Sequence, residues 1–280
     1  MFKLNAKVFW KFFVRDLAHI WTALIEGSIA SKTEKANDQI VRTVIDELQD
    51  RTLNFLECLY PGIPLNIEGV SQWPPENDYC SVDLVDGTQS LLLGTSLFGI
   101  QFAVVVDGVI EESVIFLPTE QRLGGGFHMA KRNMGAFVVL DENLSIPIHT
   151  SKVEKLSKAN IAFDGTTHAV ALLYQHQHSL TLAVRRIRNM SAFCWAGTRL
   201  ARGNNLPLSI DAVIGINNKP WDHIPSIALV EQAGGMVTDF YGKPYSLLTC
   251  NDLVFSNTHL HNQIVQYLKK NPISYIKKGL

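Results

Sequence analysis

Residues 100–116 read Ile-Gln-Phe-Ala-Val-Val-Val-Asp-Gly-Val-Ile-Glu-Glu-Ser-Val-Ile-Phe. Two apolar runs, 100–106 and 109–116, flank the dipeptide Asp107-Gly108. Asp and Gly tolerate the positive φ angles that a two-residue hairpin turn requires. The stretch therefore predicts a β-hairpin, and with it antiparallel pairing in place of a regular alternation of parallel strands and helices.

Two amphipathic helices are predicted before this hairpin. Apolar residues recur every three to four positions over residues 9–24 and again over residues 38–56. This is the period of one face of an α-helix. Ser31 and Glu34 also fit a capping box, which would start the second helix earlier.

After the hairpin, short apolar runs alternate with helical patterns, and Gly, Pro and Asn separate them. Strands are expected at 79–85, 136–140, 160–163, 210–216, 236–240 and 252–256, and helices at 169–186, 192–202, 222–233 and 259–270. This order indicates the α+β class, with mixed sheets in layers. A polar seam at 141–158 suggests an N-terminal half, residues 1–145, and a C-terminal half, residues 146–280.

Composition narrows the class of protein further. The chain has 25 Lys and Arg residues against 26 Asp and Glu, a formal net charge of −1. This balance argues against nucleic acid or a membrane as partner, because both attract clustered cations. The triplet Arg185, Arg186 and Arg188 is expected to form a solvated helix face. No window approaches the ~18 uncharged apolar residues of a membrane span, charges interrupt the apolar N-terminal stretch, and the cysteines are scattered, so a cytoplasmic protein without a signal peptide or membrane span is expected.

The strand at 79–85 runs into the sequence Asp83-Leu-Val-Asp86-Gly87-Thr88. Two carboxylates at a strand end can hold a hard cation, and the following Gly and Thr can expose backbone N–H groups to an anion. Such a loop suits a phosphorylated substrate. The alternative is a turn in which both Asp residues only cap the next segment.

A third acid, Asp222, lies at the start of the helix that Lys219-Pro220 opens and Gly234-Gly235 closes. Proline before a helix and glycine after it are typical boundary signals. A carboxylate in the first turn is favoured by the helix dipole, so capping alone explains Asp222. Metal ligation is the second interpretation.

Together, the two segments resemble the signature motifs of the inositol monophosphatase family. The first motif is Asp83-Leu-Val-Asp86-Gly87-Thr88, and the second is Trp221-Asp222 with the tail Glu231-Gln-Ala-Gly-Gly235. The family is similar in fold to fructose bisphosphatases. The resemblance implies a layered α/β/α/β/α sandwich, a homodimer, and lithium-sensitive hydrolysis of a small phosphate monoester with two or three magnesium ions.

The resemblance also implies a metal-binding set. Glu68 matches the acid of the family's Gly-Glu-Glu segment, and Asp83 is expected to bridge two ions. Asp86 and Asp222 are expected to hold the second ion. The carbonyl oxygen of Val85 completes the ligands.

Phosphate and water are assigned by the same resemblance. Gly87 and Thr88 are expected to receive the phosphate at a helix start. Asp38 is expected to partner Thr88 in positioning the attacking water, and either this pair or Glu68 removes its proton. The segment Ser191-Ala192 matches a substrate-binding loop. His223, directly after Asp222, either contacts the leaving group or covers the helix start.

Several residues depart from the family pattern. Leu84 replaces the usual proline, the segment around Glu68 has one acid instead of two, and Gly215 replaces an acid that often binds a sugar hydroxyl. These departures give inositol little support as the substrate. They also motivate an alternative function, a catalytically weakened family member that acts as a protein-binding or regulatory module.

Haloacid dehalogenase-like phosphatases also use an Asp-Gly-Thr sequence. They require one residue between two aspartates, whereas two residues separate Asp83 from Asp86. The second Asp-Gly-Thr, at Asp164, has Ala162 where the nucleophile would stand. Asp164 is therefore interpreted as a turn residue.

Overall fold

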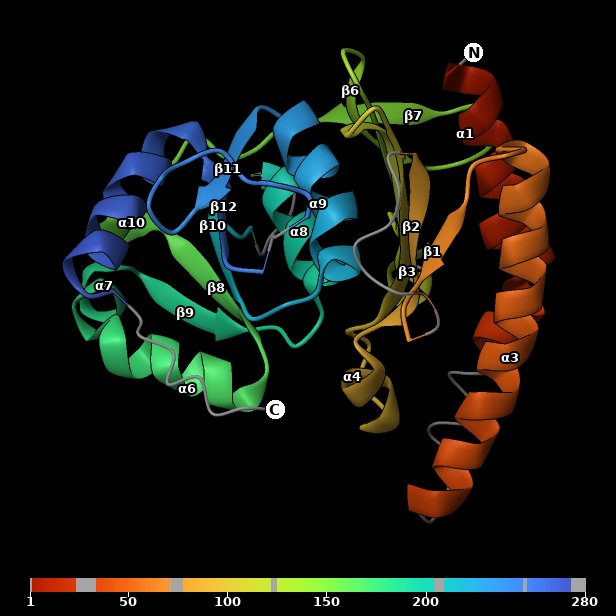
Figure 1. Ribbon diagram of the computed structural model, residues 1–280, viewed down its shortest axis with the longest axis horizontal. Helices are drawn as coiled ribbons and strands as arrows, with labels where there is room; N and C mark the ends of the chain where they lie inside the picture. The colour runs from red at the N-terminus through yellow and green to blue at the C-terminus, as the bar shows by residue number, and fades with distance from the viewer. Residues whose placement is uncertain are drawn as a thin grey trace.

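The computed structural model describes residues 2–23, 34–69, 71, 78–121, 125–203, 209–248 and 251–272. Two sheets alternate with three helical layers, as Figure 1 shows, which confirms the predicted α+β class and five-layer sandwich. Among the described residues, every helix is too short or too polar to span a bilayer.

The first outer layer and the first sheet come from the N-terminal part of the chain. The layer contains α1 (Phe2–Trp10), the π-helical η1 (Lys11–Asp16) and α3 (Glu34–Leu59). The sheet contains β1 (Leu65–Ile67), β2 (Tyr79–Asp86), β3 (Gly99–Val106), β4 (Val109–Phe116), β5 (Phe127–Lys131), β6 (Gly135–Val139) and β7 (Ser145–Ile148). Two short helices connect its strands, α4 (Thr88–Leu92) and α5 (Pro118–Gln121).

The remaining layers come from the rest of the chain. The middle layer contains α8 (Phe193–Ala201) and α9 (Pro220–Gln232). The second sheet contains β8 (Asn160–Gly165), β9 (Arg186–Asn189), β10 (Ala212–Ile216), β11 (Gly235–Asp239) and β12 (Leu253–Asn257). The outer layer contains α6 (Thr167–His176), α7 (His178–Ala183) and α10 (Thr258–Lys270), and the 3₁₀ turn η2 (Leu156–Lys158) precedes β8.

The predicted hairpin organises the first sheet. Asp107 and Gly108 have φ angles of 50° and 71°, and they join β3 to β4. The sheet continues as an antiparallel meander in strand order β1 to β7, with β1 alone parallel to its neighbour. In the β2–β3 register Asp83 lies opposite Gln101, on the face that packs against α9.

Burial of apolar side chains holds the layers together. Phe9 and Phe13 pack with Phe102 between the first outer layer and the first sheet. Phe193 of α8 packs against Phe255 of β12, with ring centroids 4.9 Å apart. Helix α9 contributes Ile224, Ile227 and Leu229 to a buried cluster that also contains residues of both sheets, such as Ile115 and Val213.

Two expectations need correction. The helix at 169–186 is two helices broken at the buried Gln177, whose side chain donates a hydrogen bond to the Asn271 carbonyl oxygen at 2.6 Å. Arg186 and Arg188 lie on the edge strand β9, not on a helix, because this segment pairs with β8. The polar seam contains β7, which pairs with β6, so the chain leaves the first sheet after Ile148. Helix α3 is described from Glu34, earlier than residue 38, while Ser31 lies outside the described residues.

Candidate metal and phosphate site

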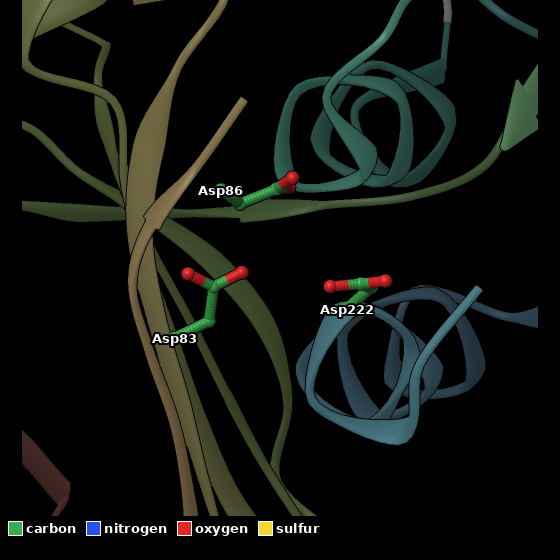
Figure 2. Close-up of side chains that lie close together, drawn as sticks. All are labelled: Asp83, Asp86 and Asp222. Carbon is green, nitrogen blue, oxygen red and sulfur yellow. The ribbon is translucent and has the colours of Figure 1, made fainter. Parts of the chain in front are cut away.

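Three aspartates from distant parts of the chain meet between the first sheet and the middle layer. Asp83 and Asp86 come from the end of β2, and Asp222 comes from the first turn of α9. Figure 2 shows their carboxylates converging on one space. One carboxylate oxygen from each residue lies within 4.8 Å of the others. Oxygen ligands at this spacing suit a hard divalent cation.

Local structure fixes each carboxylate. Asp83 Oδ1 accepts a hydrogen bond from Val85 N at 3.0 Å. The Asp86 carboxylate accepts from the backbone N–H of Cys194, at the start of α8, and from that of Gly87. Asp222 Oδ2 accepts from Lys219 N at 2.8 Å, so the capping role expected for Asp222 is present alongside its place in the cluster.

The cluster concentrates negative charge in a poorly solvated space. Burial raises the pKa of Asp83 well above its usual value, and the charges of Glu68, Asp86 and Asp222 raise it further. Burial also raises the pKa of Asp86 to about 6 and that of Asp222 well above its usual value. Among the described residues, none of the three forms an ion pair. A bound cation would offset this unfavourable charge.

Glu68 lies at the rim of the cluster. It follows β1 in an exposed turn, and its backbone N–H donates to the Val82 carbonyl oxygen at 3.0 Å. Its carboxyl shares a hydrogen bond with Asp83, and its charge acts on all three aspartates. Glu68 is outside the group of oxygens within 4.8 Å, so the structure brings together three of the four expected acids and places the fourth beside them.

The loop after the aspartates brings backbone close to the cluster. Gly87 has a φ of 85°, and a Cβ atom there would lie 2.4 Å from the Leu97 carbonyl oxygen. Thr88 begins α4, and its Oγ1 donates to the Val85 carbonyl oxygen at 2.8 Å. A carbonyl oxygen has two lone pairs, so the Val85 oxygen keeps one for another partner.

The remaining expected residues are distributed as follows. Asp38 belongs to α3, but its side chain lies outside the described part of the chain. Ser191-Ala192 approaches the Gly87 loop, since a Cβ atom at Gly87 would lie 2.9 Å from Ala192 Cβ. His223 has no exposed surface and packs edge-on against Phe193, with ring centroids 4.5 Å apart. This burial favours the interpretation that His223 covers the helix start, and the substrate contact stays a prediction.

Gln101 is a site residue that the sequence reasoning missed. Its side chain is fully buried, and Nε2 lies 3.5 Å from Asp83 Oδ2, 3.4 Å from Asp86 Oδ2 and 3.3 Å from the Asp222 carbonyl oxygen. Its Oε1 is buried and has no hydrogen-bond partner among the described residues. The sequence does carry a signal for this residue, because Gln101 is the one polar residue in the otherwise apolar run 100–106.

Asp164 is a second missed residue, and its interpretation as a simple turn residue is wrong. It is the second-last residue of β8, is 5% exposed, and accepts a hydrogen bond from Asn218 Nδ2 at 3.1 Å. Burial raises its pKa to about 7, and the charge of Asp86 adds to the shift. In the β8–β10 register Asp164 lies opposite Gly215, the position that lacks the expected acid.

Comparisons with known proteins agree with the fold and the motifs. A sequence profile described as the inositol monophosphatase family matches residues 26–272. The chain is 26% identical over 185 residues to a histidinol-phosphatase of Chlorobaculum parvum, covering 66% of this chain and 65% of that protein, slightly less than two thirds of its length. It is 24% identical over 269 residues to the Nus factor SuhB of Vibrio cholerae, covering 93% of this chain and 94% of that protein.

A solved structure shares nearly the whole fold. The calcium-bound inositol monophosphatase family protein of Staphylococcus aureus superposes with a TM-score of 0.75 and 21% identity. The match covers 98% of this chain and 99% of that one. At this identity the likeness supports the layered architecture.

Proposed function

Because the chain belongs to the inositol monophosphatase family, we propose that it hydrolyses a small phosphate monoester with the help of magnesium ions. The observation that carries the proposal is the cluster of Asp83, Asp86 and Asp222, whose oxygens lie within 4.8 Å of one another. The ligands are hard oxygens, their charge is unpaired among the described residues, and Mg²⁺ prefers such donors.

Asp83, Asp86 and Asp222 hold the ions in this proposal, with Glu68 and the Val85 carbonyl oxygen at the edge. Magnesium, when bound there, neutralises phosphoryl oxygens and makes a water molecule more acidic. We infer two or three ions from the number of acidic side chains that act on one another.

The protein's own groups bind and orient the reactants. The αL conformation of Gly87 lets the backbone at the start of α4 approach the phosphate. Thr88, with Asp38, orients the attacking water, and Glu68 lies close enough to the cluster to take its proton. A phosphate monoester carries negative charge and repels an anionic nucleophile. Attack therefore requires the positive charge that bound magnesium would supply and the alignment that these protein groups provide.

Phosphate release from a panel of sugar, inositol and nucleotide phosphates tests the proposal. In millimolar magnesium, purified protein should release phosphate, and Asp86→Asn should lower the rate at least a hundredfold. Asp50→Asn, an exposed acid on α3, is the matched control and should keep full activity. Activity that persists in excess chelator would contradict the metal assignment.

A second candidate function is a regulatory or protein-binding role, with loss of catalysis. The match to a Nus factor over 93% of this chain favours it, and so does the single acid around Glu68. Absence of phosphate release across the whole panel, from protein that binds magnesium and is folded, would select this role. A homodimer is part of both proposals, and light scattering of the purified chain measures it.

A further inference from the structure

A cavity lies between the edge of the second sheet and α8. Its volume is about 140 Å³, several times the ~30 Å³ that one water molecule occupies in the liquid. Its polar lining comes from Asn160, Arg185, Arg186, Arg188 and Ser209, and Trp195 contributes an aromatic wall. The proposed catalytic function uses none of these side chains.

The strand register explains why the arginines face this cavity. β9 is an edge strand, and Arg186 and Arg188 pair with Asn160 and Ala162 of β8. Residues opposite each other in a sheet share a face, and Ala162 packs into the core that contains α8. The two arginines therefore stand on the side of β9 that faces α8, and both side chains are exposed to solvent.

The positive charge of the cavity is largely unpaired. No acid lines it, and Arg186 and Arg188 form no ion pair with any described residue. The charge of Arg185 acts on the Asp211 carboxylate, where it opposes the rise in pKa that burial causes. Asp211 already accepts hydrogen bonds from Ser151 Oγ at 2.6 Å and Asn160 N at 2.7 Å.

Trp195 gives an independent indication of a ligand. The residue is 9% exposed, and its indole Nε1 is buried without a hydrogen-bond partner among the described residues. Indole N–H and guanidinium groups are donors only, and the side-chain acceptors that the lining offers them are neutral, the Asn160 amide oxygen and the Ser209 hydroxyl. An anion with several oxygens would satisfy them, and guanidinium matches phosphate with paired hydrogen bonds.

We propose that this cavity binds a phosphate group, either as inorganic phosphate or as part of a molecule that carries two phosphates. Asn160 begins β8, and Asp164, on which the charge of Asp86 acts, lies four residues further along the strand, roughly 13 Å away at ~3.3 Å per residue. The cavity is therefore separate from the aspartate cluster. A phosphate bound there cannot be the group whose ester bond is hydrolysed at the cluster.

Thermal unfolding in excess chelator, where the aspartates hold no metal, tests this site. Inorganic phosphate should raise the unfolding midpoint of the unaltered protein in a saturable way, beyond the effect of potassium chloride at equal ionic strength. The double variant Arg186→Gln/Arg188→Gln should bind phosphate at least tenfold more weakly. The matched control is Lys269→Gln/Lys270→Gln, which removes two exposed charges at the end of α10 and should respond like the unaltered protein.

A second variant guards against a folding defect. Trp195→Phe keeps an aromatic ring but removes the N–H, and it should weaken phosphate binding about threefold to tenfold. Because Trp195 also packs in the core and under the Arg199 guanidinium, the phosphate shift of this variant is measured from its own midpoint in chloride. A sugar bisphosphate that binds at least tenfold tighter than inorganic phosphate identifies the doubly phosphorylated ligand, while equal affinities identify free phosphate.

Two results would overturn the proposal. One is an equal phosphate response in the Arg186→Gln/Arg188→Gln variant, which would make the effect an adventitious ion only. The other is a change of that variant from dimer to monomer with no phosphate response in either protein, which would make the arginines interface residues. Because catalysis is not measured, failure of the proposed phosphatase activity leaves the test intact.

Discussion

Gln101 lies opposite Asp83 across the β2–β3 pair, and its amide nitrogen is 3.5 Å from Asp83 Oδ2. The same nitrogen is 3.4 Å from Asp86 Oδ2. A neutral donor thus stands between a buried carboxylate and a partly buried one, at the place where a cation would bind. Each contact is long, but together they reduce the repulsion between carboxylates in a space of low dielectric constant.

Replacement of Gln101 by Leu should therefore destabilise the metal-free protein more than the magnesium-bound protein. Loss of the donor leaves buried acceptors unsatisfied, at a cost of about 1–3 kcal/mol. Bound magnesium would supply the missing positive charge, so the stabilisation that magnesium gives should be larger in Gln101→Leu. Urea unfolding in chelator and in magnesium measures both quantities.

The matched control for this variant is Gln177→Leu. Gln177 is also fully buried and also donates through Nε2, but to the Asn271 carbonyl oxygen in the outer layer. Its loss should lower stability equally with and without magnesium. An equal loss for Gln101→Leu in the two conditions would show that Gln101 has no part in the metal site.

Metal-free stability should fall as pH rises through about 6. Burial raises the pKa of Asp86 from 3.8 to about 6, so the folded state favours the protonated carboxyl. Stability from this group is complete below pH 3.8 and is lost as pH rises through the folded value, by roughly 3 kcal/mol at ~1.4 kcal/mol per pH unit. Unfolding free energies from pH 4 to 8 in chelator measure the slope. Saturating magnesium should reduce it, and a slope unchanged by magnesium would contradict a shared site.

Much of this architecture could be predicted because local signals agreed with the final packing. Asp107-Gly108 specified its hairpin through a backbone requirement, and Pro220 marked the start of α9. β9 could not be predicted in this way, because Arg186 and Arg188 carry no strand periodicity and the segment becomes a strand only by pairing with β8.

The site was predictable only in part, for a related physical reason. Asp83 and Asp222 carry recognisable neighbours along the chain, whereas Gln101 and Asp164 act through strand register. Sequence spacing does not show which residue stands opposite another across a sheet. His223 illustrates the converse, since its place beside Asp222 suggested a functional contact and the packing of Phe193 around it buries it.

Asp164→Asn should be more stable than the unaltered protein, and the difference should be larger at pH 8 than at pH 5. Burial raises the pKa of Asp164 to about 7, so this carboxyl is neutral in the folded protein at pH 5 and ionised at pH 8. At pH 5 the variant should be more stable by roughly 1–2 kcal/mol, because the unfolded carboxyl is ionised there while the folded one is neutral, and an amide can still accept from Asn218 Nδ2. At pH 8 the difference should grow to roughly 4 kcal/mol, at ~1.4 kcal/mol per unit for a shift from 3.8 to about 7.

The measurement is urea unfolding in chelator at the two pH values. Asp50→Asn, at an exposed position of α3, serves as the control, and its stability relative to the unaltered protein should not change between the two pH values. If Asp164→Asn were less stable at pH 8 than at pH 5 relative to the unaltered protein, the carboxylate would have to be favourably paired when ionised.

Gly87→Ala should impair both folding and phosphate release, whereas Gly94→Ala should affect stability only slightly. Both glycines have positive φ, 85° and 70°, so both variants lose about 1 kcal/mol from backbone strain. Only Gly87 has neighbours in the way: a Cβ atom would lie 2.4 Å from the Leu97 carbonyl oxygen and 2.9 Å from Ala192 Cβ, while nothing lies within 4 Å at Gly94. Relief of that overlap must move the loop that joins Asp86 to α4, so the loss in unfolding free energy should exceed that of Gly94→Ala by about 1–3 kcal/mol. Urea unfolding and phosphate release on the same preparations test this, and equal behaviour of the two variants would show that the close approach at Gly87 has no role in the site.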